Sequence, residues 1–91
     1  MLEKSVELAF TKGVRLRDGI APKCERIGKG WPDRVVLARE GRIAFVELKR
    51  PDGRLGVRQR LIAKMLEALG FDVFCLYTKE EVETWLEGWF R

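Results

Sequence analysis

The sequence predicts an α/β fold in which a small mixed β-sheet is flanked by helices, in the order α-β-β-β-α-β-α. Three observations lead to this prediction. Apolar residues recur every three or four positions near the start, after the middle and at the end of the chain, which is typical of amphipathic helices. Short runs of β-branched and aromatic residues, bounded by glycine and proline, are typical of strands. No repeat or linker is visible in the 91 residues, so we expect a single domain over residues 1–91.

The first half of the chain is expected to supply one helix and three strands. A helix is predicted over residues 2–17, where apolar side chains recur at every fourth position, at Leu2, Val6, Phe10 and Val14. Residues 20–24 are short and partly apolar, which favours a strand, and GKGWPD at residues 28–33 favours a loop. Two further strands are predicted over residues 33–40 and 42–49, joined by a hairpin turn at Glu40 and Gly41.

The second half is expected to supply a helix, a strand and a last helix. Residues 51–56 favour a loop, and residues 57–69 favour a helix that Gly70 ends, with apolar positions at Leu61, Ile62, Met65, Leu66 and Leu69. Residues 71–77 form a nearly continuous apolar run, which is typical of a strand buried on both faces. Thr78 as N-cap and Glu81 at the third helical position form a capping box. The last helix gathers on one face Val82, Trp85, Leu86 and Trp89.

The composition narrows the chemistry of the chain. The formal net charge is +4, which favours a polyanionic partner. The sequence has no histidine, which excludes Ser-His-Asp and Cys-His catalysis and any zinc site built on imidazole. Cys24 and Cys75 lie in apolar surroundings and are interpreted as reduced core thiols. Any metal is therefore expected to be held mainly by carboxylates and carbonyls, the ligands that Mg²⁺ and Mn²⁺ prefer.

Neither a membrane span nor a secretory signal is predicted. No apolar run approaches the roughly 20 residues needed to cross a bilayer, so no membrane contact is expected. The N-terminal segment MLEKSVELAF carries acids and lacks the long apolar region of a signal peptide. We therefore expect a cytoplasmic protein, in a bacterial cell or a phage-infected host cell.

Two carboxylates and one ammonium are predicted to converge where the hairpin strands end. Side chains alternate between the faces of a strand, so Glu47 and Lys49 share one face of a segment otherwise built for burial. Charges in such a place are unfavourable unless they are paired or functional. Asp33 lies fourteen positions before Glu47, with the turn at Glu40 and Gly41 midway between them. Folding back at this turn brings Asp33 close to Glu47.

This grouping suits a divalent cation. Two close carboxylates raise each other's pKa, and a cation removes the repulsion. Mg²⁺ or Mn²⁺ held by Asp33, Glu47, the main-chain carbonyl of Leu48 and several waters is a normal arrangement for phosphate chemistry. Lys49 would then orient a water and stabilise the charge of the transition state. Taken singly, Asp33 also fits a Pro-Asp turn, and Glu47 with Lys49 also fits an ion pair on an exposed edge.

The chain contains the PD-(D/E)xK nuclease pattern, as P-D-x13-E-x-K, over Pro32, Asp33, Glu47, Leu48 and Lys49. More specifically, it resembles the VRR-NUC family, the virus-type replication-repair nucleases, over almost its whole length. The resemblance rests on GWPDRVVL, on FVELKRPDG, on the strand led by Gly70 and on the acidic-capped last helix, together with Glu7, Lys23 and Gln59. It implies a restriction-endonuclease-like core and a deoxyribonuclease dependent on Mg²⁺ or Mn²⁺.

The resemblance also implies roles for residues outside this pattern. A carboxylate of the first helix is expected in the metal's shell, where Glu7 fits best and Glu3, one turn earlier, is the alternative. Gln59 is expected near the catalytic site, with a helix cap or a buried amide as the other interpretation. The sequence departs from the family at Trp31, where a smaller apolar residue is usual, and at residues 55–57, where a helix-capping serine is usual.

The sequence therefore predicts a metal-dependent DNA endonuclease, and the resemblance implies branched or flapped DNA in replication and repair, including Holliday junctions. Candidate phosphate contacts, with solubilising charge as the alternative, are Lys23, Arg26, Lys29, Arg34 and Arg50. Cutting two strands of a junction needs two sites, so a two-fold homodimer is expected. Large aromatics such as Trp85, Trp89 and Phe90 are most often core residues, but they are more than one small core needs. Part of the last helix is therefore a candidate dimer surface, with the first helix as the alternative. A catalytically idle DNA-binding module and a subunit of a larger repair complex remain as alternatives.

Overall fold

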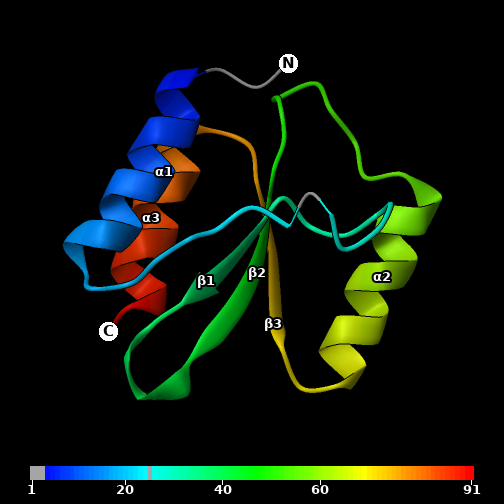
Figure 1. Ribbon diagram of the computed structural model, residues 1–91. Helices are drawn as coiled ribbons and strands as arrows, with labels where there is room; N and C mark the ends of the chain where they lie inside the picture. The colour runs from blue at the N-terminus through cyan, green and yellow to red at the C-terminus, as the bar shows by residue number, and fades with distance from the viewer. Residues whose placement is uncertain (1–3, 25) are drawn as a thin grey trace.

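The computed structural model describes residues 4–24 and 26–91, and its elements follow the predicted order (Figure 1). In place of a full first strand, residues 20–24 contact the sheet through two isolated bridges, Ile20–Leu37 and Lys23–Arg34. The elements are α1 (Lys4–Leu16), β1 (Arg34–Leu37), the 3₁₀ turn η1 (Arg39–Gly41), β2 (Ile43–Leu48), α2 (Val57–Ala68), β3 (Asp72–Leu76) and α3 (Lys79–Trp89).

The three strands form a mixed sheet in the order β1-β2-β3. β1 pairs antiparallel with β2, with Arg34 opposite Val46, and β2 pairs parallel with β3. The turn expected between β1 and β2 is present, and Glu40 takes the left-handed backbone conformation there, with φ 64°. β3 lies at an edge of the sheet, so its middle residues are half-buried and Leu76 is its one buried residue. The prediction of a strand buried on both faces was therefore wrong for most of β3.

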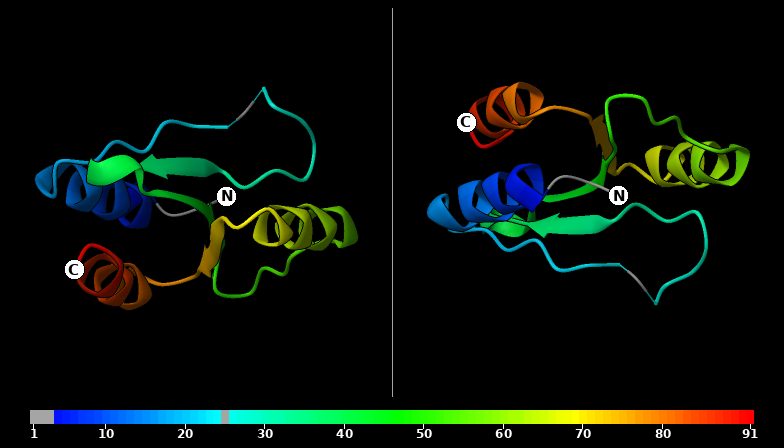
Figure 2. Two further views of the ribbon diagram at one scale, coloured as in Figure 1. Left: turned by 90° about the horizontal axis from the view of Figure 1, so that it is seen from below. Right: turned by 90° about the horizontal axis from the view of Figure 1, so that it is seen from above.

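Helices α1 and α3 lie side by side and cover the face of the sheet that carries Ala44, Val46 and Leu48 (Figure 2). Gly13 of α1 allows the close approach of the two helices, because a Cβ at this position would collide with Leu86 of α3. Leu2 and Glu3, expected in the first helix, lie outside the described residues. The largest fully buried side chains are Phe10, Val14, Val36, Val46 and Val82.

Trp85 belongs to this core, and Trp89 and Phe90 pack against it, which favours the core interpretation of these residues over a dimer surface. Trp85 is 8% exposed, and its ring centroid lies 5.6 Å from that of Phe10. Trp89 stacks on Trp85 at 5.3 Å, and the guanidinium carbon of Arg42 lies 4.1 Å from the ring centroid of Trp89. Phe90 is half-buried and packs against both tryptophans. The bulk of this helix is thus used inside the domain.

Helix α2 packs beside β3, on the side of the sheet away from α1 and α3 (Figures 1 and 2). Leu66 is buried, whereas Leu61, Met65 and Leu69 are exposed, so the apolar positions that located this helix do not all face the sheet. A row of apolar side chains follows the outer side of the helix at every fourth position. We name it the α2 stripe; the exposed fractions are 66% for Val57, 62% for Leu61, 42% for Met65 and 67% for Leu69. Contiguous exposed apolar residues of this kind mark interaction surfaces.

Cys24 is buried, Cys75 is half-buried, and both are free thiols. Burial raises the pKa of each thiol above its usual value, which keeps both protonated at neutral pH. Across residues 4–24 and 26–91, no helix is long and apolar enough to cross a membrane.

Candidate active site

Asp33 and Glu47 face each other where β1 begins and β2 nears its end. Because Arg34 pairs with Val46, the residue before β1, Asp33, falls opposite Glu47. Each carboxylate accepts a hydrogen bond from the main chain of the opposite segment: the Asp33 N–H donates to Glu47 Oε1 at 3.1 Å, and the Leu48 N–H donates to Asp33 Oδ2 at 2.9 Å. The hairpin therefore brings the two carboxylates together, as the position of the turn predicts.

Glu47 is a buried carboxylate, 7% exposed, in contact with two donor side chains. Lys49 Nζ lies 3.4 Å from Glu47 Oε2, and Gln59 Nε2 donates to the same oxygen at 3.2 Å. Burial raises the pKa of Glu47 above its usual value and the Asp33 carboxylate raises it further, whereas Lys49 lowers it. The net upward shift means that the protein alone compensates this negative charge only in part.

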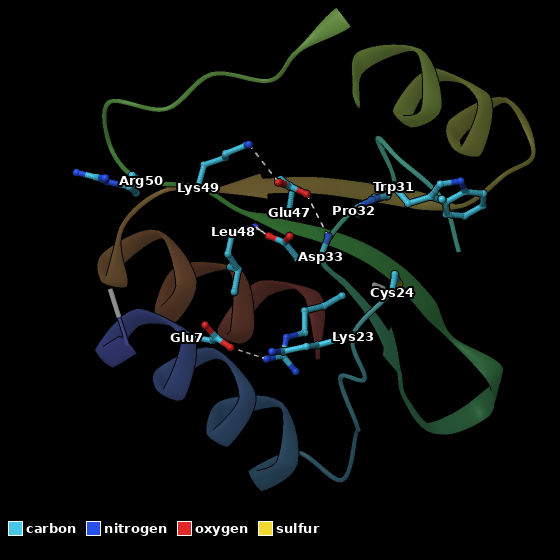
Figure 3. Close-up of a pocket in the computed structure, with 12 residues that line it drawn as sticks. Glu7, Lys23, Cys24, Trp31, Pro32, Asp33, Glu47, Leu48, Lys49 and Arg50 are labelled. Carbon is cyan, nitrogen blue, oxygen red and sulfur yellow. Dashed lines mark hydrogen bonds and ion pairs between the residues drawn. The ribbon is translucent and has the colours of Figure 1, made fainter. Parts of the chain in front are cut away.

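A cavity of about 460 Å³ opens over these groups (Figure 3). Its volume lies within the range of roughly 300–1,000 Å³ that is typical of ligand sites. It brings together most of the residues predicted for the catalytic site, namely Glu7, Asp33, Glu47, Leu48 and Lys49. Gln59 lines a smaller neighbouring cavity of about 220 Å³, of which Glu47 forms a wall as well.

Glu7 reaches the large cavity from α1, but its carboxylate is bound by Arg34. Arg34 Nη2 lies 2.8 Å from Glu7 Oε1, and Arg34 Nη1 donates to the Ala21 carbonyl at 2.7 Å. The Arg34 side chain is 12% exposed and needs a counter-ion, which Glu7 supplies. Within residues 4–24 and 26–91, no three acidic or thiol side chains are grouped as a metal site. Glu7 therefore lines the same cavity as Asp33 and Glu47 without forming a three-carboxylate metal site with them, and the alternative, Glu3, lies outside the described residues.

Gln59 combines the two roles that the sequence left open. Its side-chain Oε1 accepts a hydrogen bond from the Gly56 N–H at 2.8 Å, which caps the start of α2. Its Nε2 meanwhile donates to Glu47. The Gln59 side chain therefore caps α2, where the family resemblance led us to expect a serine cap. The same side chain also contacts the Glu47 carboxylate.

The basic residues predicted to contact DNA lie around the large cavity or on the loop before it. Three of them line the cavity, namely Lys23, Arg34 and Arg50. The other two, Arg26 and Lys29, are exposed on the loop before it. Trp31 and Cys24 line the same cavity, although the sequence did not single them out for the catalytic site. The position of Trp31, directly before Pro32 and Asp33, is the feature of the sequence that could have indicated its place at this cavity.

The oxygen donors at this site suit a hard divalent cation. Asp33 and Glu47 offer two carboxylates, and Leu48, which is hydrogen-bonded to Asp33 through its N–H, is the residue whose carbonyl was predicted as a third donor. Mg²⁺ typically uses one or two carboxylates and retains several waters, so two carboxylates and a carbonyl are sufficient. A cation would also offset the charge that burial and Asp33 make unfavourable on Glu47.

Comparisons with known proteins point to one family. The family model of the VRR-NUC domain matches residues 14–80. A solved structure described as a VRR-NUC domain superposes with a TM-score of 0.86 and 24% sequence identity, over 96% of each chain. This likeness establishes the fold. A search of curated proteins found no match. The segment matched by the family model contains Asp33, Glu47, Lys49 and Gln59, and Glu7 precedes it.

Proposed function

The chain belongs to the VRR-NUC family, and from this membership we propose that it is a DNA endonuclease that hydrolyses phosphodiester bonds with the help of a divalent metal. Membership makes it a nuclease-type DNA-processing domain, and nucleases of this family typically depend on a divalent metal. The observation that carries the proposal is the pair Asp33 and Glu47, whose carboxylates are held by the main-chain N–H groups of Leu48 and Asp33 beside Lys49 in one cavity.

Asp33, Glu47 and the Leu48 carbonyl are proposed to hold Mg²⁺ or Mn²⁺. A bound cation of this kind lowers the pKa of water and offsets charge on the phosphate. The protein's own contribution is to hold the two carboxylates together, and the main-chain N–H groups of Asp33 and Leu48 do this at 3.1 and 2.9 Å. Gln59 steadies Glu47 from the side of α2.

Lys49 is proposed to orient the attacking water and to stabilise the charge that builds up on the phosphate. Water forms a new bond to phosphorus, the bond to one sugar oxygen breaks, and that oxygen takes up a proton. The Lys49 ammonium lies 3.4 Å from Glu47 Oε2, so it is held next to the carboxylate pair. A fixed positive charge in a partly buried site stabilises such a transition state more strongly than it would in water.

Glu7 is proposed to act through Arg34 and not on the metal. The ion pair holds the guanidinium at the wall of the cavity, where its remaining N–H groups can bind a DNA phosphate. Further phosphate contacts are proposed for the exposed basic residues around the site, Lys23, Arg26, Lys29 and Arg50.

Branched or flapped DNA, including Holliday junctions, is the proposed substrate, in replication or repair in the cytoplasm of a bacterial or phage-infected cell. Paired cuts in a junction need two copies of the site, and we propose a two-fold homodimer. The α2 stripe supports this, because antiparallel packing of two α2 helices would cover both stripes. A 12-residue helix is only about 18 Å long. Neighbouring surface must therefore supply part of the roughly 1,200–2,000 Å² of a stable interface.

Cleavage of linear, flapped and four-way DNA with Mg²⁺, Mn²⁺ or EDTA tests the proposal. Asp33→Asn and Glu47→Gln remove charge with little change of shape, and each should abolish metal-dependent cleavage. Asp18→Asn is the matched control, because Asp18 is exposed, lies outside the catalytic cavity and has a positive φ of 65° that Asn also tolerates. Full activity of both site variants would contradict the assignment. DNA binding without any cleavage by the wild type would favour an idle binding module.

A further inference from the structure

Trp31 lines the active-site cavity and has no part in the proposed hydrolysis. It directly precedes the Pro32-Asp33 pair and is half-buried, and Figure 3 shows it at the edge of the cavity, with its indole extending away from Glu47 and Lys49. A large flat apolar surface at a site that handles a charged phosphate calls for an explanation beyond metal binding.

The loop that carries Trp31 is held against the start of α2. Gly30 has a positive φ of 87°, and a Cβ added there would lie 2.7 Å from Arg58 Cγ and 3.2 Å from the Arg58 carbonyl carbon. Arg58 Nε also donates to the Lys29 carbonyl at 3.2 Å. These contacts fix the backbone on the N-terminal side of Trp31 and so hold this residue at the edge of the cavity. A preorganised surface loses less entropy when it binds a ligand.

Trp31 is half-buried, and its ring contact with Phe45 does not cover both faces of the indole. Among the described residues its ring partner is Phe45, with centroids 6.0 Å apart and ring planes at 64°. An edge-to-face contact of this kind covers at most one face of either ring. Trp89 differs, because one face lies on Trp85 at an interplanar angle of 12° and the guanidinium of Arg42 also lies over its ring.

Cationic side chains line the same cavity. Lys23, Lys49 and Arg50 are in its wall, and the exposed Lys29 lies two residues before Trp31. Aromatic faces combined with a positively charged groove are the means by which proteins bind single-stranded nucleic acid, with bases on the rings and phosphates on the cations. In continuous duplex the bases are stacked within the helix, whereas an unpaired nucleotide can turn its base outward.

We propose that Trp31 stacks on an unpaired base of the DNA strand held in this cavity, so that the site favours branch points and single-stranded arms over continuous duplex. The inference rests on the proposed nuclease function and adds the feature of DNA that the site selects. Every base has a flat π-face, so stacking selects for unpaired DNA without selecting its sequence.

The test uses a flapped duplex in which 2-aminopurine replaces one base at a time along the single-stranded arm next to the branch. Binding is measured in EDTA, so that no cleavage occurs, and stacking on the indole quenches the 2-aminopurine fluorescence. We expect quenching confined to one or two positions in the wild type. Trp31→Phe keeps a ring and should retain most of the quenching. Trp31→Leu keeps apolar bulk without a ring, and should lose the quenching and bind the flap about tenfold to a hundredfold more weakly, with unchanged affinity for continuous duplex.

Three outcomes would overturn the inference: no quenched position in the wild type, equal losses in both variants, or an equal loss of affinity for continuous duplex. Any of these would leave Trp31 as a packing partner of Phe45. The wild-type measurement needs no variant, so a folding defect in Trp31→Leu does not remove the test. Quenching without cleavage in Mg²⁺ or Mn²⁺ would refute the nuclease and leave the stacking intact. Cleavage without quenching would refute the stacking and leave the nuclease function intact.

Discussion

At the scale of single residues, Lys49 is the most informative side chain to remove. Lys49→Ala should lower the single-turnover cleavage rate by about 100- to 1,000-fold, the usual effect of losing one group that stabilises transition-state charge. Metal and DNA binding should change little, because Asp33, Glu47 and the surface cations remain. Lys12→Ala, an exposed change on α1 away from the cavity, is the control. A Lys49→Ala rate within tenfold of the wild type would leave Lys49 as an ion-pair partner only.

The raised pKa of Glu47 predicts how stability depends on pH. The shift is upward from the usual value of 4.5, with burial as its main cause. In the metal-free protein the contribution of Glu47 to stability is therefore fully present below pH 4.5 and is lost as the pH rises through the folded-state pKa. The thermal midpoint in EDTA should fall over this interval in the wild type relative to Glu47→Gln, and Mg²⁺ should restore it at neutral pH. Identical pH profiles for the two proteins would contradict the prediction.

The sequence predicted the meeting of Asp33 and Glu47 because hairpin register can be counted from the turn, and Glu40 lies midway between the two residues. It did not predict the partner of Glu7. Helical spacing places a residue on a face of its helix and says nothing of what the fold brings opposite. Arg34, which binds Glu7, lies 27 positions further along the chain.

At the scale of elements, the Glu7–Arg34 ion pair ties α1 to β1. Glu7→Gln should lower the free energy of unfolding by about 1–2 kcal/mol, because a charged hydrogen bond to a largely buried guanidinium is weakened. DNA affinity should fall about tenfold, which corresponds to about 1.4 kcal/mol. Affinity for Mn²⁺, measured by calorimetry, should stay within about twofold, since the proposed ligands are untouched.

Asp18→Asn provides the comparison for this prediction. It weakens the exposed Asp18–Arg39 ion pair, whose side chains are 65% and 77% exposed, and should cost at most about 0.5 kcal/mol. A tenfold or greater loss of Mn²⁺ affinity in Glu7→Gln would instead make Glu7 a metal ligand.

Helices α2 and α3 show why burial was harder to predict than helix position. Apolar periodicity located both helices within a residue or two. Which apolar stripe of a helix is buried, however, depends on the elements that pack against the helix. The parallel strand β3 leaves the outer side of α2 without cover, and the junction of α1 and α3 buries Trp85 and half-buries Trp89. The segment 20–24 likewise forms two bridges and not a continuous strand. The Pro22 carbonyl accepts from the Val35 N–H, but proline has no N–H to donate to a ladder.

At the scale of the whole molecule, the α2 stripe predicts the assembly. The 10.6 kDa chain should scatter light as a dimer at micromolar concentration. Leu61→Glu places a charge in the stripe at a residue that is 62% exposed, so the fold should persist while the dimer dissociates. Paired cuts in a four-way junction should then give way to single nicks.

Leu16→Glu is the matched control for the dimer, because Leu16 is a similar residue, 73% exposed, on α1. It should leave both the dimer and the paired cuts unchanged. A wild-type monomer that still cuts junctions in pairs would refute the dimer and the use of two sites together. If the dimer persists in Leu61→Glu, the interface does not involve the α2 stripe.

The two hydrogen bonds between the carboxylate pair and the main chain also constrain how this domain can evolve. A strand that slips by one residue sends every side chain to the opposite face of the sheet, and here it would also break both bonds. The carboxylate atoms proposed to serve catalysis therefore also hold the hairpin in alignment. Asp33→Ala would remove the acceptor of the Leu48 N–H and so weaken the alignment of the hairpin as well as the proposed activity. Asp33→Asn would keep an acceptor for this N–H. We expect inactive descendants of such a domain to carry amides at these two positions more often than apolar residues.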